Sequence, residues 1–156
     1  MKVGAWIVSL AWLVAAPVVT SQGAMAQQDG GAKTRVSVWS GVYTAAQSKR
    51  GEELYSGACA QCHGLRLNGA AQPDQPPSPA IARAAFLRKW AGKPVAELFV
   101  YVRTNMPPDN PGTLTDQQSI DAIAHMFAVS EMPAGSRELP LDPKALANIM
   151  IEAQPK

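Results

Sequence analysis

Apolar residues recur at helical spacing through most of the chain beyond residue 44. The clearest predicted helix begins after the capping box of Thr115 and Gln118 and ends near Ser130. The same spacing predicts helices over 82–90 and 94–104. The apolar face of the clearest helix is made by Ile120, Ile123, Ala124 and Phe127.

Two further helices are expected, one on each side of these. Thr44 and Gln47 form a second capping box, which predicts a helix over about 46–60. Asp142 and Pro143 suit an N-cap and a first helical position, so a short amphipathic helix should follow them. Its apolar residues are Leu146, Ile149 and Met150.

Proline-rich segments separate the predicted helices. Neither 68–80 nor 105–112 can form a long helix or a central strand, so both are predicted loops. Apolar and polar residues alternate only briefly, over 36–43, which predicts an extended arm lying on the domain. Because no region is rich in strands, the predicted fold class is all-α.

Cys59, Cys62 and His63 form a CxxCH motif, the attachment signature of a covalently bound haem c. Two thiols three positions apart at a helical turn can add to the two vinyl groups of one porphyrin. His63 then follows as an axial ligand of the iron. A thioredoxin-like dithiol would lie near a βαβ pattern, which is not visible. A zinc site would need a second Cys/His pair, whereas His125 is the only other Cys or His in the chain.

Residues 1–26 have the pattern of a secretory signal peptide. Lys2 precedes an uncharged apolar run over 6–19, and Ala24 and Ala26 place small residues where a signal peptidase cuts. The run has 14 residues, fewer than the roughly 20 that a membrane-spanning helix needs. We therefore expect a periplasmic protein of one domain with no stable membrane span. An uncleaved N-terminal anchor stays open as the alternative.

Charge is distributed unevenly along the expected mature chain. Residues 27–104 contain ten Lys or Arg and five Asp or Glu, whereas 105–156 contain three and seven. Such a dipole can orient an encounter with a partner, although chance asymmetry of an ordinary solvated surface is the alternative. The basic residues have no interleaved aromatic residues, which argues against a nucleic-acid partner.

The order of the elements resembles that of class I monohaem cytochromes c. The resemblance covers about 43–130 and consists of an attachment motif on an N-terminal helix, a proline-rich loop, a Met-Pro loop and a following helix. It implies N- and C-terminal helices that cross, with short helices and loops wrapped round one haem. The expected domains are a flexible leader and extended arm at 27–43, a cytochrome c domain at 44–131, and a C-terminal extension with a short helix at 132–156.

The resemblance implies further ligands of the haem iron and of its histidine. The methionine of the Met-Pro loop is the second axial ligand in this family, and by position it is Met106. A thioether ligand favours ferrous iron and raises the reduction potential. Met132 also precedes a proline, but it follows the long helix and is expected to lie off the haem face. The Pro79 carbonyl is expected to accept the second ring proton of His63.

The resemblance also suggests which side chains bind the acidic edge of the haem. Trp90 and Arg103 are expected to donate hydrogen bonds to the haem propionates, because a buried carboxylate needs paired donors. A purely structural role in the core is the alternative for Trp90.

The resemblance also suggests which residues lie where the two terminal helices cross. Gly51 and Tyr55 match the family's glycine and aromatic residue at the crossing, and their counterparts should include Ile123 and Phe127. His125 stands where relatives often carry an aromatic residue. It is expected to be exposed, packed in the crossing, or titrating near neutral pH.

The predicted function is electron transfer rather than catalysis. With His63 and Met106 on the iron, no coordination site is open to a substrate. The segments at 37–44 and 133–140 resemble exported cytochromes that accept electrons from periplasmic dehydrogenases of molybdenum, quinoprotein or sulfur-compound type. A terminal oxidase or another cytochrome is the expected acceptor. The alternatives are a haem enzyme or gas-binding protein with an open distal site, and a fixed subunit of a dehydrogenase complex.

Overall fold

The computed structural model describes Met1 and residues 35–69 and 78–156. The chain divides into two units, Met1–Gly30 and Gly31–Lys156, and every element below belongs to the second. The predicted signal peptide, the leader up to residue 34 and the middle of the first proline-rich loop (70–77) lie outside the described residues.

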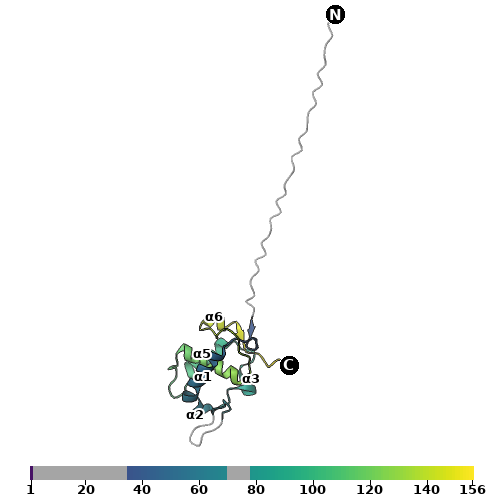
Figure 1. The fold of residues 1–156 in the computed structure, drawn as a ribbon. Coiled ribbons are helices and arrows are strands. Elements are labelled where there is room, and N and C mark those ends of the chain that lie inside the picture. Colours follow the sequence, from purple (N-terminus) through teal and green to yellow (C-terminus); the bar gives the residue numbers. More distant parts are fainter. Residues whose placement is uncertain (2–34, 70–77) are drawn as a thin grey trace. The chain divides into compact units, whose positions relative to one another are not determined.

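The described part of the chain is rich in helix, as predicted, with one very small sheet (Figure 1). This arrangement is compatible with a cytochrome c fold. None of its helices is both long and apolar enough to span a bilayer. In order, the elements are β1 (Val36–Ser37), the 3-10 turn η1 (Val38–Ser40), α1 (Ala45–Ala58), α2 (Ala60–His63), α3 (Arg83–Trp90), α4 (Val95–Asn105), α5 (Asp116–Val129), α6 (Pro143–Leu146) and β2 (Ile149–Met150).

Helices α1 and α5 cross in close contact at the centre of the domain (Figure 1). They approach most closely at Gly51, where a side-chain methyl group would overlap the main-chain carbonyl of Asp121 and touch the Cβ atom of His125. Arg50 reinforces the crossing, because its Nε and Nη2 donate to the two carboxylate oxygens of Asp121 at 2.9 and 3.0 Å. It also donates two hydrogen bonds of 2.9 Å to Glu138.

Gly51 and Tyr55 both contact α5 at His125. Gly51 faces Asp121 and His125, and the Tyr55 ring lies 5.3 Å from the His125 ring. The expected counterpart Phe127 is fully buried. The centre of its ring lies 5.9 Å from that of Phe86, and the ring also packs against Tyr43. His125 is therefore packed in the crossing, and burial is the main cause that lowers its pKa.

The capping predictions hold at α5 and α6 and only in part at α1. Thr115 and Gln118 form the full capping box of α5, and Asp142 caps α6. Thr44 caps α1 by accepting from Gln47 N. The Gln47 side chain does not return to Thr44; it is fully buried and exchanges two hydrogen bonds, 2.8 and 3.2 Å long, with the backbone of Leu139.

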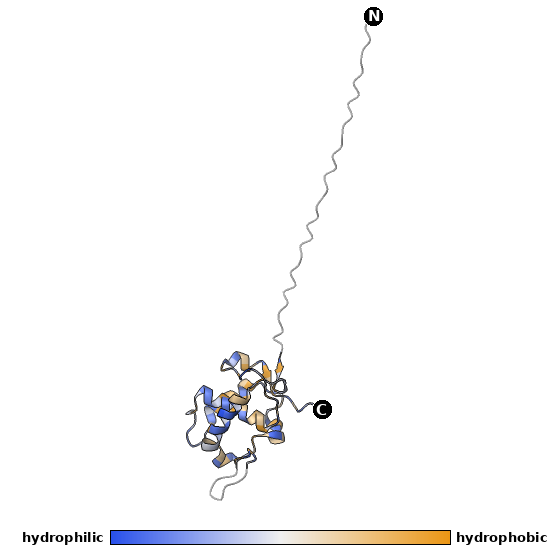
Figure 2. Ribbon diagram, in the orientation of Figure 1, coloured by the Kyte–Doolittle hydropathy of each residue, from blue (hydrophilic) through white to orange (hydrophobic). Residues whose placement is uncertain are grey.

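The prediction of a C-terminal helix reaching Met150 is wrong. Helix α6 ends at Leu146, and Ile149 and Met150 form β2, which pairs in parallel with β1 in the N-terminal arm. Next to β2, Ile151 N donates to Lys93 O at 2.9 Å. These long-range backbone bonds outweigh the local helical pattern. In Figure 2 both strands are orange, whereas α1 is largely blue.

Both ends of the described domain contribute to one core. Val38 in the arm and Leu146 and Ile151 near the C-terminus are fully buried in the same hydrophobic cluster. The Trp39 indole donates to Glu152 O at 3.1 Å, and Gly135 N donates to Tyr43 O at 2.7 Å. The arm and the C-terminal segment therefore pack against their own domain. The boundaries drawn from the sequence at 43 and 131 stay predictions.

The close approach at Gly51 can be tested with two alanine substitutions in α1. Gly51→Ala should lower the free energy of unfolding by about 1–3 kcal/mol, because the methyl group meets backbone rather than a flexible side chain. Gly57→Ala is the matched control, since nothing lies within 4 Å of a methyl group there. It should be neutral or stabilise α1 by up to about 1 kcal/mol. Thermal unfolding followed by circular dichroism measures both, and equal stability of the two variants would contradict the packing described here.

Candidate functional site

Cys59, Cys62 and His63 lie where α1 gives way to α2. The helix predicted over 46–60 breaks at Cys59, which caps the end of α1 and the start of α2. His63 N donates to Cys59 O at 2.9 Å, so helical hydrogen bonding continues across the break. Gly64 then ends α2 with φ 75° and ψ 149°, a backbone region open essentially only to glycine.

Tyr55 ties this turn back to α1. Its ring is buried, and its hydroxyl donates to Gly64 O at 2.8 Å. Burial raises the pKa of the Tyr55 phenol, which keeps this donor protonated. Burial, and secondly the charge of Cys62, raise the pKa of the Cys59 thiol to about 11.

The ring of His63 is oriented by Pro79. His63 Nδ1 lies 2.9 Å from Pro79 O, the arrangement expected from the sequence. A carbonyl can only accept, so this contact places the proton on Nδ1 and leaves the lone pair on Nε2. An imidazole held in this tautomer can act as a metal ligand through Nε2, and its partner raises its basicity.

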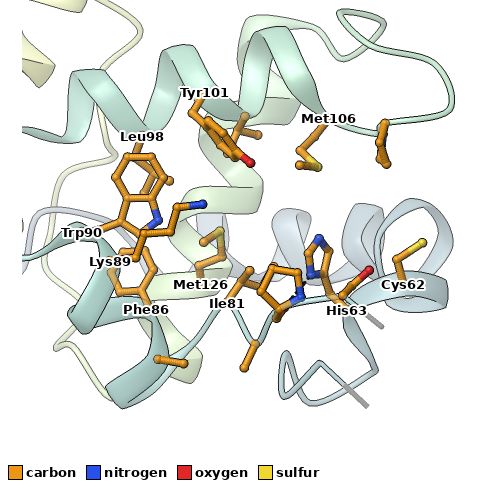
Figure 3. Close-up of a pocket in the computed structure, with 16 residues that line it drawn as sticks. Cys62, His63, Ile81, Phe86, Lys89, Trp90, Leu98, Tyr101, Met106 and Met126 are labelled. Carbon is orange, nitrogen blue, oxygen red and sulfur yellow. Dashed lines mark hydrogen bonds between the residues drawn. The ribbon is translucent and has the colours of Figure 1, made fainter. Parts of the chain in front are cut away.

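Met106 faces His63 from the other side of a cavity. It directly follows α4, and its N–H donates to Val102 O at 3.1 Å. Figure 3 shows the side chains of Met106 and His63 pointing toward one another. Met132, by contrast, is buried and its carbonyl accepts from the Tyr43 hydroxyl at 2.7 Å. It is not among the residues that line the cavities next to His63.

His63 and Met106 stand between two adjoining cavities of about 240 Å³ and about 300 Å³. Cys59 lines the second cavity, and Cys62 lines both. One place thus offers two thiols, an imidazole lone pair and a thioether within mainly apolar walls. This donor set fits a covalently attached porphyrin with its iron between two axial side chains. The residues that line both cavities are Cys62, His63, Ile81, Val102, Met106, Pro108 and Met126.

The two side chains expected at the propionates lie in different surroundings. Trp90 is buried and lines the first cavity. Arg103 lines neither cavity: its Nε donates to Asp116 at 2.7 Å, and its Nη1 donates to Gly112 O at 2.7 Å. A role for Arg103 at a propionate would require these bonds to break. The structure therefore brings Trp90, but not Arg103, to the candidate site.

Lys89, Tyr101 and Met126 line the first cavity, but the sequence did not predict any of them there. Met126 belongs to a stretch of α5 that is buried on every side, from Ser119 to Phe127. Ser119, Asp121 and His125 interrupt the apolar residues of this stretch, so the sequence gives only a partial signal of a fully buried helix. Lys89 and Tyr101 carry no such signal, because each reads as a surface residue.

A family model matches the middle of the chain. The family model described as "Cytochrome C oxidase, cbb3-type, subunit III" matches residues 46–126, just over half of the 156 residues. The matched region begins in α1 and ends in α5, so it includes every residue shared by the two cavities. Neither a search of curated proteins nor a search of solved structures returns a significant match.

The hydroxyl of Tyr55 can be tested against that of Tyr43. Each donates to a main-chain carbonyl in the interior, so Tyr55→Phe and Tyr43→Phe should each cost about 1–2 kcal/mol of unfolding free energy. Only Tyr55→Phe frees the turn that carries His63. We therefore expect it alone to alter the absorption spectrum of the haem-loaded protein. Unchanged spectra in both variants would show that this bond does not position His63.

Proposed function

The chain belongs to the cytochrome c family whose model matches it, and from this premise we propose that it is an electron carrier with one covalent haem ligated by His63 and Met106. The observation that carries the proposal is the opposition of His63 and Met106 across a mainly apolar cavity whose other lining residues include Cys59 and Cys62. Filling both axial positions leaves the chain no open coordination site for a substrate. This favours a carrier over a haem enzyme or a gas-binding protein.

Different residues of the site have different roles in binding the haem. Cys59 and Cys62 are the attachment points, and Pro79 holds the His63 ring with Nε2 available as a ligand. When bound, the haem supplies an iron that takes up and releases one electron. The chain contributes a thioether ligand from Met106 and apolar walls that exclude water, and both favour the ferrous form.

We also propose the class I arrangement for this domain. Its support is the crossing of α1 and α5 at Gly51, with the attachment motif after the first of these helices and Met106 ahead of the second. In this arrangement α1 and α5 form one scaffold, and α2 and the end of α4 bring the two axial ligands to it.

The proposed setting is the periplasm, with a dehydrogenase of molybdenum, quinoprotein or sulfur-compound type as donor. A terminal oxidase or another cytochrome is the proposed acceptor. The family model's description names an oxidase subunit, which is compatible with the acceptor side of this scheme. The signal-peptide pattern over 1–26 supports the location.

A freely diffusing carrier is favoured over a fixed subunit. The two segments that would offer docking surface in a complex are the arm around Trp39 and the segment after Met132. Both are engaged with their own domain, through the Trp39 bond to Glu152 and the pairing of β1 with β2. Small, short-lived contacts with partners then suffice for electron transfer.

Three methionine-to-leucine variants test the ligand. Leucine nearly conserves volume, so each exchange should cost less than about 1.5 kcal/mol in stability. Met106→Leu should leave the haem attached but open the sixth position, so that the ferrous protein binds carbon monoxide. Met126→Leu removes the other thioether that lines both cavities, and Met132→Leu removes one that lines neither. Both should stay closed to carbon monoxide. A closed site in Met106→Leu, or an open one in Met126→Leu, would contradict the ligand assignment.

A further inference from the structure

Three hydrogen-bond donors gather at one end of the first cavity. Lys89 and Trp90 come from the last turn of α3, Tyr101 comes from α4, and all three line the cavity. The Lys89 ammonium lies 4.5 Å from the centre of the Tyr101 ring and 5.4 Å from that of Trp90. The two rings pack edge to face with centres 5.5 Å apart. Cation–π attraction thus holds the ammonium in place, and Figure 3 shows it extending past Trp90 toward the cavity.

These donors have no protein acceptor in the part of the chain that the structure describes, and the Lys89 and Tyr101 side chains are exposed to solvent. Lys89 Nζ, Trp90 Nε1 and Tyr101 Oη make neither a hydrogen bond nor an ion pair there. Neighbouring cations are already paired: Lys93 lies 3.8 Å from Glu97, and Arg103 lies 2.7 Å from Asp116. One ammonium and two neutral donors that share a cavity wall without an acceptor are suited to bind a carboxylate.

The attachment cysteines lie at the opposite end. Figure 3 places Cys62 and Trp90 at the two ends of the cavity, with His63 and Met106 between them. In a porphyrin of the haem c type, the groups that form the thioether bonds and the two propionates are carried on opposite halves of the ring. A ring attached through Cys59 and Cys62 therefore turns its acidic edge toward the end where Lys89 lies.

We propose that Lys89, together with Trp90 and Tyr101, forms the propionate site of this chain, with the Lys89 ammonium as the counter-charge of a haem carboxylate. This assignment rests on the proposed function, because the carboxylate is present only when the haem is. It gives Lys89 and Tyr101 the role that the sequence assigned to Arg103. Lys89 is a positioning residue that also sets the electrostatic potential at the iron.

Removing the Lys89 charge should lower the reduction potential of the haem. A positive charge beside the haem opposes the additional positive charge of ferric iron. Without it the ferric form is stabilised and the reduction potential falls. For one partly hydrated charge we expect the ferric-to-ferrous ratio at a fixed applied potential to rise about two- to fourfold. At 59 mV per tenfold change for one electron, this is a decrease of about 18–36 mV.

The experiment compares Lys89→Gln with Lys93→Gln by potentiometric titration of the haem-loaded proteins. Lys93 is the matched control, because its ammonium also lies over the Trp90 ring, at 5.2 Å, but it does not line the first cavity. We expect the decrease in Lys89→Gln only. Lys89→Met, which keeps the aliphatic stem on the rings, should repeat the decrease, and Lys89→Arg, which keeps the charge, should retain the wild-type potential.

Each other outcome overturns a specific statement. A wild-type potential in Lys89→Gln and Lys89→Met, or an equal decrease in Lys93→Gln, would overturn the assignment of Lys89. A decrease in Lys89→Arg as large as that in Lys89→Gln would show that the effect is structural rather than electrostatic, and would overturn it too. A wild-type protein that carries no covalent haem would instead contradict the proposed function, and the assignment would fall with it.

Discussion

The contact between Gly51 and the main chain of Asp121 determines how the rest of the domain is built. Because Gly51 has no side chain to separate the helices at this point, the backbones of α1 and α5 come into direct contact and the crossing is fixed. Cys59 at the end of α1 and His63 in the following α2 then lie in one wall of the cavity, and α5 supplies Met126 to the same space. The crossing therefore positions one proposed axial ligand and part of the cavity wall.

The thiols, the axial side chains and the ammonium occupy separate places in mainly apolar walls, and this division accounts for the proposed chemistry. The thiols lie at one end, the Lys89 ammonium at the other, and the imidazole and thioether face each other between them. Apolar walls favour the state of lower charge at an iron centre. In the proposed carrier a cation at the acidic edge would add to that preference, so that burial, a Met106 ligand and Lys89 would all act in the same direction.

How far the sequence predicts this structure depends on the range of the interactions involved. Helix starts at Thr115 and Asp142 were predictable, because a cap is formed by residues a few positions apart. Strand β2 was not, since Ile149 pairs with Val36 at the other end of the domain. In the site, the CxxCH motif is local and visible, whereas the Met106 and Pro79 positions came from a family resemblance. The position of Lys89 in the cavity wall was not predictable, because only the fold brings its ammonium over the Tyr101 ring.

The central claim is that one covalent haem is closed on both faces by His63 and Met106. The most direct test is an absorption spectrum of the wild-type protein, matured in a bacterial periplasm and recorded oxidised, reduced and under carbon monoxide. The account predicts a covalently held, low-spin haem with a sulfur-to-iron charge-transfer band in the ferric state and no change under carbon monoxide. A high-spin spectrum, or rapid carbon monoxide binding by the reduced protein, would contradict it and would favour a haem enzyme or gas-binding protein.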